Sequence, residues 1–176
     1  MFLNTLLLRT NINPASKRTL LKAAMSTSTP PVPIALIGIH TSIGEPVAAA
    51  LRPDYDVTRF VQTFEAAKAD LPHLLRGSEP PTAPTNAVGS HDYSRPVRAV
   101  LFGRGFTQQE AETLYGLYKD VAPSVLWVAG AETGRPPGGV VAEPPPGVEK
   151  IVVPVFRGVL EKWVQEGAEK GGLVLY

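Results

Sequence analysis

Short runs rich in apolar and β-branched residues alternate along this chain with segments whose apolar residues recur every three or four positions. The first pattern is typical of strands in a buried sheet, and the second of helices with one apolar face. We therefore predict five strands, and residues 173–176 form either an edge strand or a packed tail. The predicted strands are 34–37, 56–61, 97–102, 124–129 and 151–153.

Helices are predicted between these strands. The first opens at Gly44 and is closed by Pro53. The second begins at Thr63 and ends at Gly77, because glycine suits the left-handed conformation of a helix cap. Pro72 removes a backbone donor from this second helix, so we expect a break near Asp70.

The third and fourth helices carry clearer signals. Thr107 and Glu110 have the Thr-x-x-Glu spacing of a capping box, which starts a helix. Its apolar face continues through Ala111, Leu114, Tyr118 and Val121. The last helix lies between Phe156 and Val164, after the predicted strand 151–153.

Strands that alternate with helices predict an α/β fold. The chain should form a three-layer sandwich around a mostly parallel five-stranded sheet, Rossmann-like or flavodoxin-like, with right-handed crossovers. We expect one such domain over residues 33–176 and leave the strand order open. Two Pro/Gly-rich loops, 78–96 and 130–148, interrupt the alternation.

Residues 1–32 stand apart as a basic leader or disordered N-terminus. No acidic residue precedes Glu45, while the leader carries four basic residues. Residues 1–24 have the composition of a mitochondrial transit peptide, although Met25 offers an alternative start. The chain is thus expected in the cytoplasm, or in mitochondria if the leader directs import.

Composition excludes several classes of protein. The 17 Lys and Arg nearly balance the 16 Asp and Glu, which argues against a nucleic-acid binder. The chain has no Cys, so disulfides and thiolate chemistry are ruled out, and its His residues lack the paired spacing of a metal site. No stretch approaches the ~20 apolar residues of a membrane span.

Ligands of open parallel sheets bind beyond the carboxyl ends of the strands, where helix N-termini favour anions. Glycine turns and arginines from distant parts of the sequence are predicted to meet there. The candidate ligand-binding residues are Gly38, His40, Thr41, Ser42, Gly44, Gly103, Arg104, Arg135 and Arg157. By contrast, residues 90–95 precede a strand and should lie at the opposite edge, unless their long loop folds over.

The segment 37–44 resembles the glycine-rich turn of short-chain dehydrogenases and related NAD(P)-binding Rossmann proteins. Gly38 and Gly44 match the outer glycines of that motif, whereas Ser42 replaces the middle one. The resemblance implies a dinucleotide cofactor, and Arg59 offers a contact for the 2′-phosphate of NADP. The glycines would equally serve a tight strand-to-helix turn alone.

Catalytic signals are sparse. His40 is a candidate general acid or base because it sits in the ligand-facing turn. Tyr115 and Lys119 have the Tyr-x-x-x-Lys spacing of short-chain dehydrogenases, but we interpret them as a pair on a helix surface.

Residues 64–75, 91–96 and 101–106 are similar to small uncharacterised proteins of filamentous fungi, some encoded near secondary-metabolite enzymes. Two functions follow as hypotheses. In the first, the chain binds an anionic small molecule or nucleotide and is an oxidoreductase of reduced size, linked to secondary metabolism. Alternatively, it is a non-catalytic protein that forms a homodimer or binds a protein partner.

Overall fold

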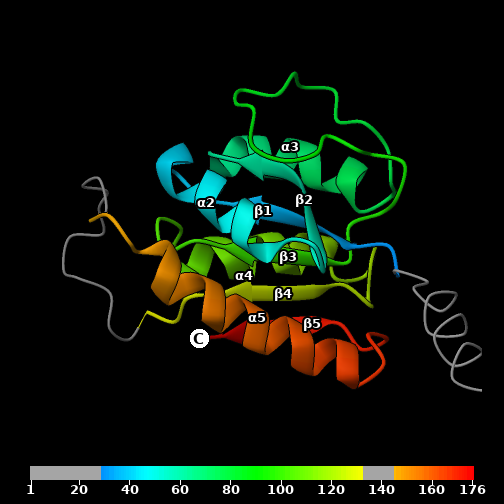
Figure 1. Cartoon of the computed structure of the whole chain (residues 1–176). Helices are drawn as coiled ribbons and strands as arrows, with labels where there is room; N and C mark the ends of the chain where they lie inside the picture. The colour runs from blue at the N-terminus through cyan, green and yellow to red at the C-terminus, as the bar shows by residue number, and fades with distance from the viewer. Residues whose placement is uncertain (1–28, 133–144) are drawn as a thin grey trace, which may run out of the picture. The chain divides into compact units, whose positions relative to one another are not determined.

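A computed structural model describes residues 29–132 and 145–176, and its elements belong to a compact unit that runs from Pro31 to Tyr176. Five parallel strands form one sheet in the order β2-β1-β3-β4-β5 (Figure 1). This order is that of flavodoxin-like proteins. The strands are β1 (Val32–Ile37), β2 (Tyr55–Val61), β3 (Ala99–Phe102), β4 (Leu126–Ala129) and β5 (Gly172–Leu175).

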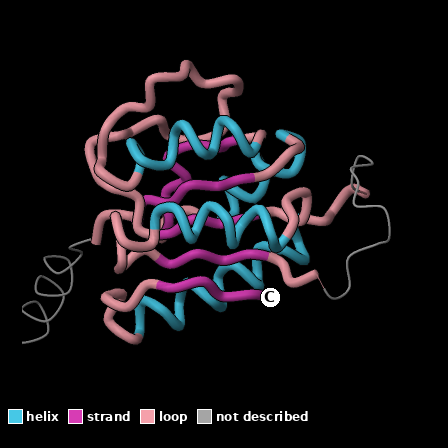
Figure 2. The backbone as a smooth tube through the Cα atoms, turned by 180° about the vertical axis from the view of Figure 1, so that it is seen from behind, coloured by secondary structure: helices cyan, strands magenta, loops and turns pink. Residues whose placement is uncertain are grey.

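Four helices cover the two faces of the sheet, which confirms the predicted three-layer sandwich. They are α2 (Thr41–Leu51), α3 (Phe64–Leu74), α4 (Gln108–Tyr118) and α5 (Glu149–Gln165). Helices α2 and α5 lie in front of the sheet in Figure 1, and α3 and α4 lie behind it, as the reverse view in Figure 2 shows. Each face therefore has its own apolar core, and the central strands are buried on both sides. None of the described helices is both long and apolar enough to cross a membrane.

One crossover departs from the expected hand. The step from β1 to β2 and the step from β4 to β5 run in opposite directions across the sheet, yet α2 and α5 cover the same face. The β4–α5–β5 unit therefore has the opposite hand to the other three units, and is left-handed where nearly all such units are right-handed. The prediction of right-handed crossovers is wrong here because Phe156, Leu160 and Trp163 of α5 complete the core beside α2.

The fifth strand is β5, not residues 151–153. Residues 151–153 belong to the first turns of α5, so the predicted strand is wrong. The β-branched run resembles a buried strand, but Val152, Phe156 and Val159 continue the spacing of one helix face. Ile151 is 72% exposed, which a buried strand would not allow.

Helix α3 is continuous through Pro72, so the predicted break near Asp70 is wrong. A proline at position 72 leaves the carbonyl of Lys68 without its usual helical donor. The hydroxyl of Tyr118, from α4, donates to that carbonyl at 2.7 Å and takes the place of the missing N–H. Gly77 ends the helical segment at φ +69°, as expected of a C-terminal cap.

The loop 78–96, here called the strap, folds over the outer edge of β2. The N–H groups of Ser90 and His91 donate to the carbonyls of Val57 and Thr58 at 2.8 and 3.0 Å. The segment 90–95 thus runs beside β2. The long loop folds over, which is the stated exception to the predicted position at the opposite edge. The strap closes one edge of the sheet.

A buried ion pair fastens the strap. Arg59 on β2 contacts Asp70 on α3 at 2.8 Å, and both side chains are almost completely buried. Arg59 also donates to the Tyr93 hydroxyl and the Thr82 carbonyl of the strap. Because its donors are engaged inside the protein, Arg59 is not oriented toward a cofactor phosphate.

Candidate functional site

The carboxyl ends of four strands place their turns side by side. Gly103 donates its N–H to the carbonyl of Ile37 at 2.7 Å, which joins the turns after β1 and β3. Gly130, after β4, lies under the side chain of Arg104, and Ala131 donates to the carbonyl of Tyr176 at 2.9 Å. Residues far apart in sequence therefore meet at this edge, as the alternation of strands and helices predicts.

The glycines of the first turn pack against an aromatic ring. A Cβ added at Gly44 would lie 2.8 Å from the ring of Phe60, and one added at Gly38 would lie 3.0 Å from it. Phe60 is buried on β2, so its ring occupies the space that these glycines leave. The two glycines thus allow α2 to approach the sheet closely, which is the structural role weighed above.

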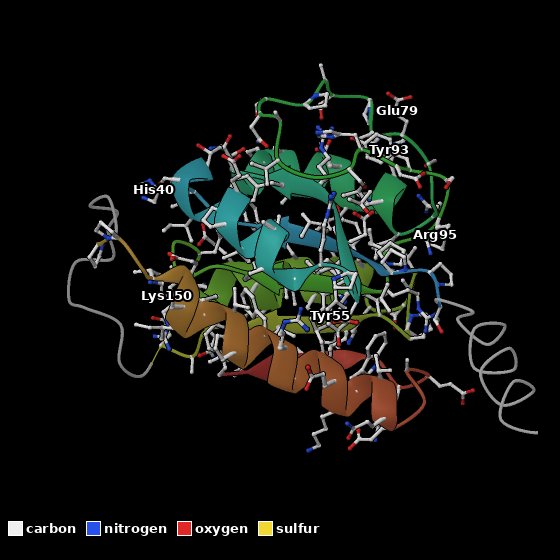
Figure 3. The ribbon with its side chains drawn as sticks, viewed as in Figure 1. His40, Tyr55, Glu79, Tyr93, Arg95 and Lys150 are labelled. Carbon is white, nitrogen blue, oxygen red and sulfur yellow. The ribbon has the colours of Figure 1, made fainter. Side chains whose placement is uncertain are left out.

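The other first-turn candidates lie at the start of α2. His40 occupies the N-cap position in an extended conformation, and its side chain makes no capping bond. Figure 3 shows His40 projecting outward from the beginning of this helix. Thr41 and Ser42 follow on the first exposed turn, so all three residues border solvent at the carboxyl edge.

The chain reverses direction across the sheet between β1 and β3, which is where such folds usually open a ligand crevice. Here Ile39 fills the space between the two turns. A Cβ added at Gly105 would lie 2.7 Å from the Ile39 side chain. The turn after β1 is thereby packed against the turn after β3.

A hollow opens one strand further along the edge, around Arg104. It is a shallow depression open to solvent, with room for about one water-sized group, and is lined by Arg104, Phe106, Gly130, Ala131 and Glu132. Arg104 is exposed, and its guanidinium carbon lies 5.4 Å from the centroid of the Tyr176 ring. It makes no ion pair with any residue in 29–132 or 145–176.

Tyr176 holds the aromatic wall beside Arg104. Its hydroxyl donates to the carbonyl of Phe102 at 3.2 Å, and its ring packs edge-on against Phe156 at 5.6 Å. Burial raises the pKa of the Tyr176 phenol, while the charge of Arg104 partly opposes that effect. The phenol is therefore a neutral donor at physiological pH.

Carboxylates of the protein itself occupy the N-terminus of α4. Glu110 accepts from the Thr107 N–H at 2.7 Å and completes the predicted capping box. Glu132 accepts from the Gln108 N–H at 2.9 Å, and the Gln108 side chain accepts from the Glu132 N–H. Glu132 is thus held toward α4, and no ion pair links it to Arg104 across the hollow.

Arg157 lies away from the carboxyl edge, which corrects its predicted position. Its guanidinium donates to the carbonyls of residues 50–52 and pairs with Asp54 at 2.9 Å, just before β2 begins. The reason is that residues 151–153 are helical, so Arg157 falls two turns into α5 rather than directly after a strand. Arg135 lies outside the described residues.

The sequence pointed to the turn 38–44 and to Gly103 and Arg104, but it did not single out Phe106 and Tyr176 as neighbours of Arg104. No sequence spacing marks either aromatic residue, because its position beside Arg104 depends on which strands lie next to each other in the sheet. Tyr115 and Lys119 have different surroundings: Tyr115 is half-buried and packs on Trp127 with ring centroids 5.8 Å apart, whereas Lys119, the C-cap of α4, is exposed. Within the described residues, no cluster of three or more His, Asp or Glu is arranged to hold a metal ion.

Comparison with known proteins gives a distant fungal homologue. The chain is 29% identical over 91 residues to Kojic acid related protein 6 of Aspergillus oryzae (strain ATCC 42149 / RIB 40). The match covers 51% of this chain and 53% of the relative, so the chain spans about half the length of the protein it matches. No family model and no solved structure matches the chain. The similarity to small fungal proteins is thus supported, and no NAD(P)-binding family is indicated.

Proposed function

We propose that this protein binds a small anionic molecule in the hollow beside Arg104 and serves fungal secondary metabolism. The observation that carries the proposal is the exposed guanidinium of Arg104, held against the Tyr176 ring without an acidic partner among the described residues. A cation fixed in this way favours an anion because little side-chain freedom is lost on binding.

The position of the hollow supports a binding role. It lies beyond the carboxyl ends of β3 and β4, at the sheet edge where ligands of parallel α/β proteins bind. Phe106 supplies an apolar surface, and the backbone of residues 130–131 supplies polar groups. The hollow itself is small and open, so it suits a single acidic oxygen of a small molecule whose remainder lies on the surface beside it.

The fungal relative suggests the first probe. Its name refers to kojic acid, a small hydroxypyranone whose enol oxygen ionises. NADPH is the second probe, since the first turn resembles that of NAD(P)-binding proteins. Inorganic phosphate is the third, because it presents charge without a ring.

Thermal denaturation of the full chain tests the proposal. At 100 times Kd, a ligand that binds only the folded state adds ~2.7 kcal/mol, enough for a clear rise in Tm. We expect kojic acid or NADPH to raise Tm, Arg104→Met to abolish the rise, and Lys119→Met, which removes an exposed charge at the C-cap of α4, to keep it. The proposal fails if no probe raises Tm, or if Arg104→Met responds as the native chain does.

A further inference from the structure

The outer edge of β5 has unpaired backbone groups. Gly172 and Tyr176 donate their N–H groups to the carbonyls of Val125 and Ala129, on the β4 side. Because backbone groups alternate along a strand, the N–H and C=O groups of Leu173 and Leu175 face away from β4. No residue of the described chain is bonded to them there.

The two edges of the sheet differ in their protection. The strap covers the edge at β2, as the bonds from Ser90 and His91 show. Strand β5 has no cover among the described residues, and it carries no charge and no proline, which are the usual guards of an open edge. Val174 and Leu175 are 38% and 40% exposed. This edge therefore suits pairing with another strand.

An apolar flank of α5 runs beside the same edge. Val155 and Val159 lie two positions before and after Arg157, about half a turn around the helix from it. Arg157 reaches toward α2, so these valines are on the flank turned toward β5. Ile151 continues the flank one turn earlier and is the most exposed large apolar residue described.

Helix α5 and β5 are aligned antiparallel. Phe156 contacts Tyr176 at one end of the strand, and the Trp163 indole N–H donates to the Lys170 carbonyl at the other. Val159 therefore lies between these two contacts, along the length of β5. Figure 1 shows α5 running in front of β4 and β5.

We propose that β5 pairs with β5 of a second copy of this chain, antiparallel about a two-fold axis at Val174. Leu173 then faces Leu175 of the other copy, and the four outward N–H groups find four carbonyls. The leucines share one face and meet their counterparts, while the two α5 flanks approach each other on the opposite face.

The second copy is the favoured partner because the edge is self-complementary about its centre, as a two-fold interface requires. Strand β5 has four residues, and two of them turn their backbone groups outward, so the contact is small for a stable interface. We therefore expect a dimer that dissociates on dilution. The inference is independent of the proposed ligand.

Light scattering coupled to size exclusion, with the full chain from low to high micromolar concentration, tests the dimer. Leu175→Pro removes an N–H that faces away from β4, so pairing within the sheet is kept. Ile151→Lys charges the α5 flank at an exposed helix position that tolerates substitution. Leu117→Lys on α4 is the control, since Leu117 is also exposed but lies on the other face of the sheet.

We expect the native chain and Leu117→Lys to reach the dimer mass at high concentration. Leu175→Pro and Ile151→Lys should weaken association at least tenfold, with unchanged circular dichroism. If Leu175→Pro does not fold, Ile151→Lys decides alone. A native chain that stays monomeric at high micromolar concentration overturns the proposal, as does a dimer that survives in every folded edge or flank variant.

Discussion

At the scale of single residues, close packing explains why glycine stands at positions whose role the sequence motif alone does not decide. Gly38 and Gly44 have the spacing of a nucleotide-binding turn, and the structure gives them a steric role against Phe60. The spacing was readable in the sequence, whereas the ring that makes glycine necessary comes from β2 and could not be assigned to the turn. The same holds for Gly105, which faces Ile39.

Substitution of Gly44 by Ala should destabilise the protein. The new Cβ would meet the buried Phe60 ring at 2.8 Å, and overpacking of this kind costs about 1–3 kcal/mol. Gly116→Ala is the matched control, because nothing lies within 4 Å of the added Cβ and alanine favours a helix by about 0.5–1 kcal/mol. Urea denaturation measures both, and equal effects of the two substitutions would contradict the packing role.

At the scale of elements, patterns that depend on neighbouring residues were predicted well. The apolar runs gave β1, β3 and β4 to within two residues or so, and the capping box of Thr107 and Glu110 marked the start of α4. Elements decided by distant contacts were predicted less well. Pro72 reads as a helix breaker, because the hydroxyl that compensates for it belongs to Tyr118, 46 positions further along.

A double-mutant cycle tests that compensation. Tyr118→Phe removes the donor to the Lys68 carbonyl and should cost about 0.5–1.5 kcal/mol of unfolding free energy. In a Pro72→Ala background the restored N–H bonds the same carbonyl, so the loss should be smaller. An identical loss in both backgrounds would show that Tyr118 does not replace the missing helical bond.

At the scale of the whole molecule, the alternation of strands and helices predicted the parallel sheet and the edge that carries the candidate site. It did not predict the strand order, which depends on which distant strands pair, or the left-handed unit at β5, which depends on the face that α5 covers. The prediction of residues 151–153 as a strand displaced Arg157, whose guanidinium lies at the end of α2. Of the two predicted arginines among the described residues, Arg104 lies at the carboxyl edge and Arg157 does not.

Amide chemical shifts report whether Arg104 and its neighbours form the ligand site. Titration of ¹⁵N-labelled protein with the probe that raises Tm most should shift the amides of Arg104, Phe106, Gly130 and Ala131 together, with one binding constant. Arg104→Met should remove these shifts. Shifts confined to the start of α2, or to the strap, would place the ligand elsewhere and rule out the hollow beside Arg104 as its site.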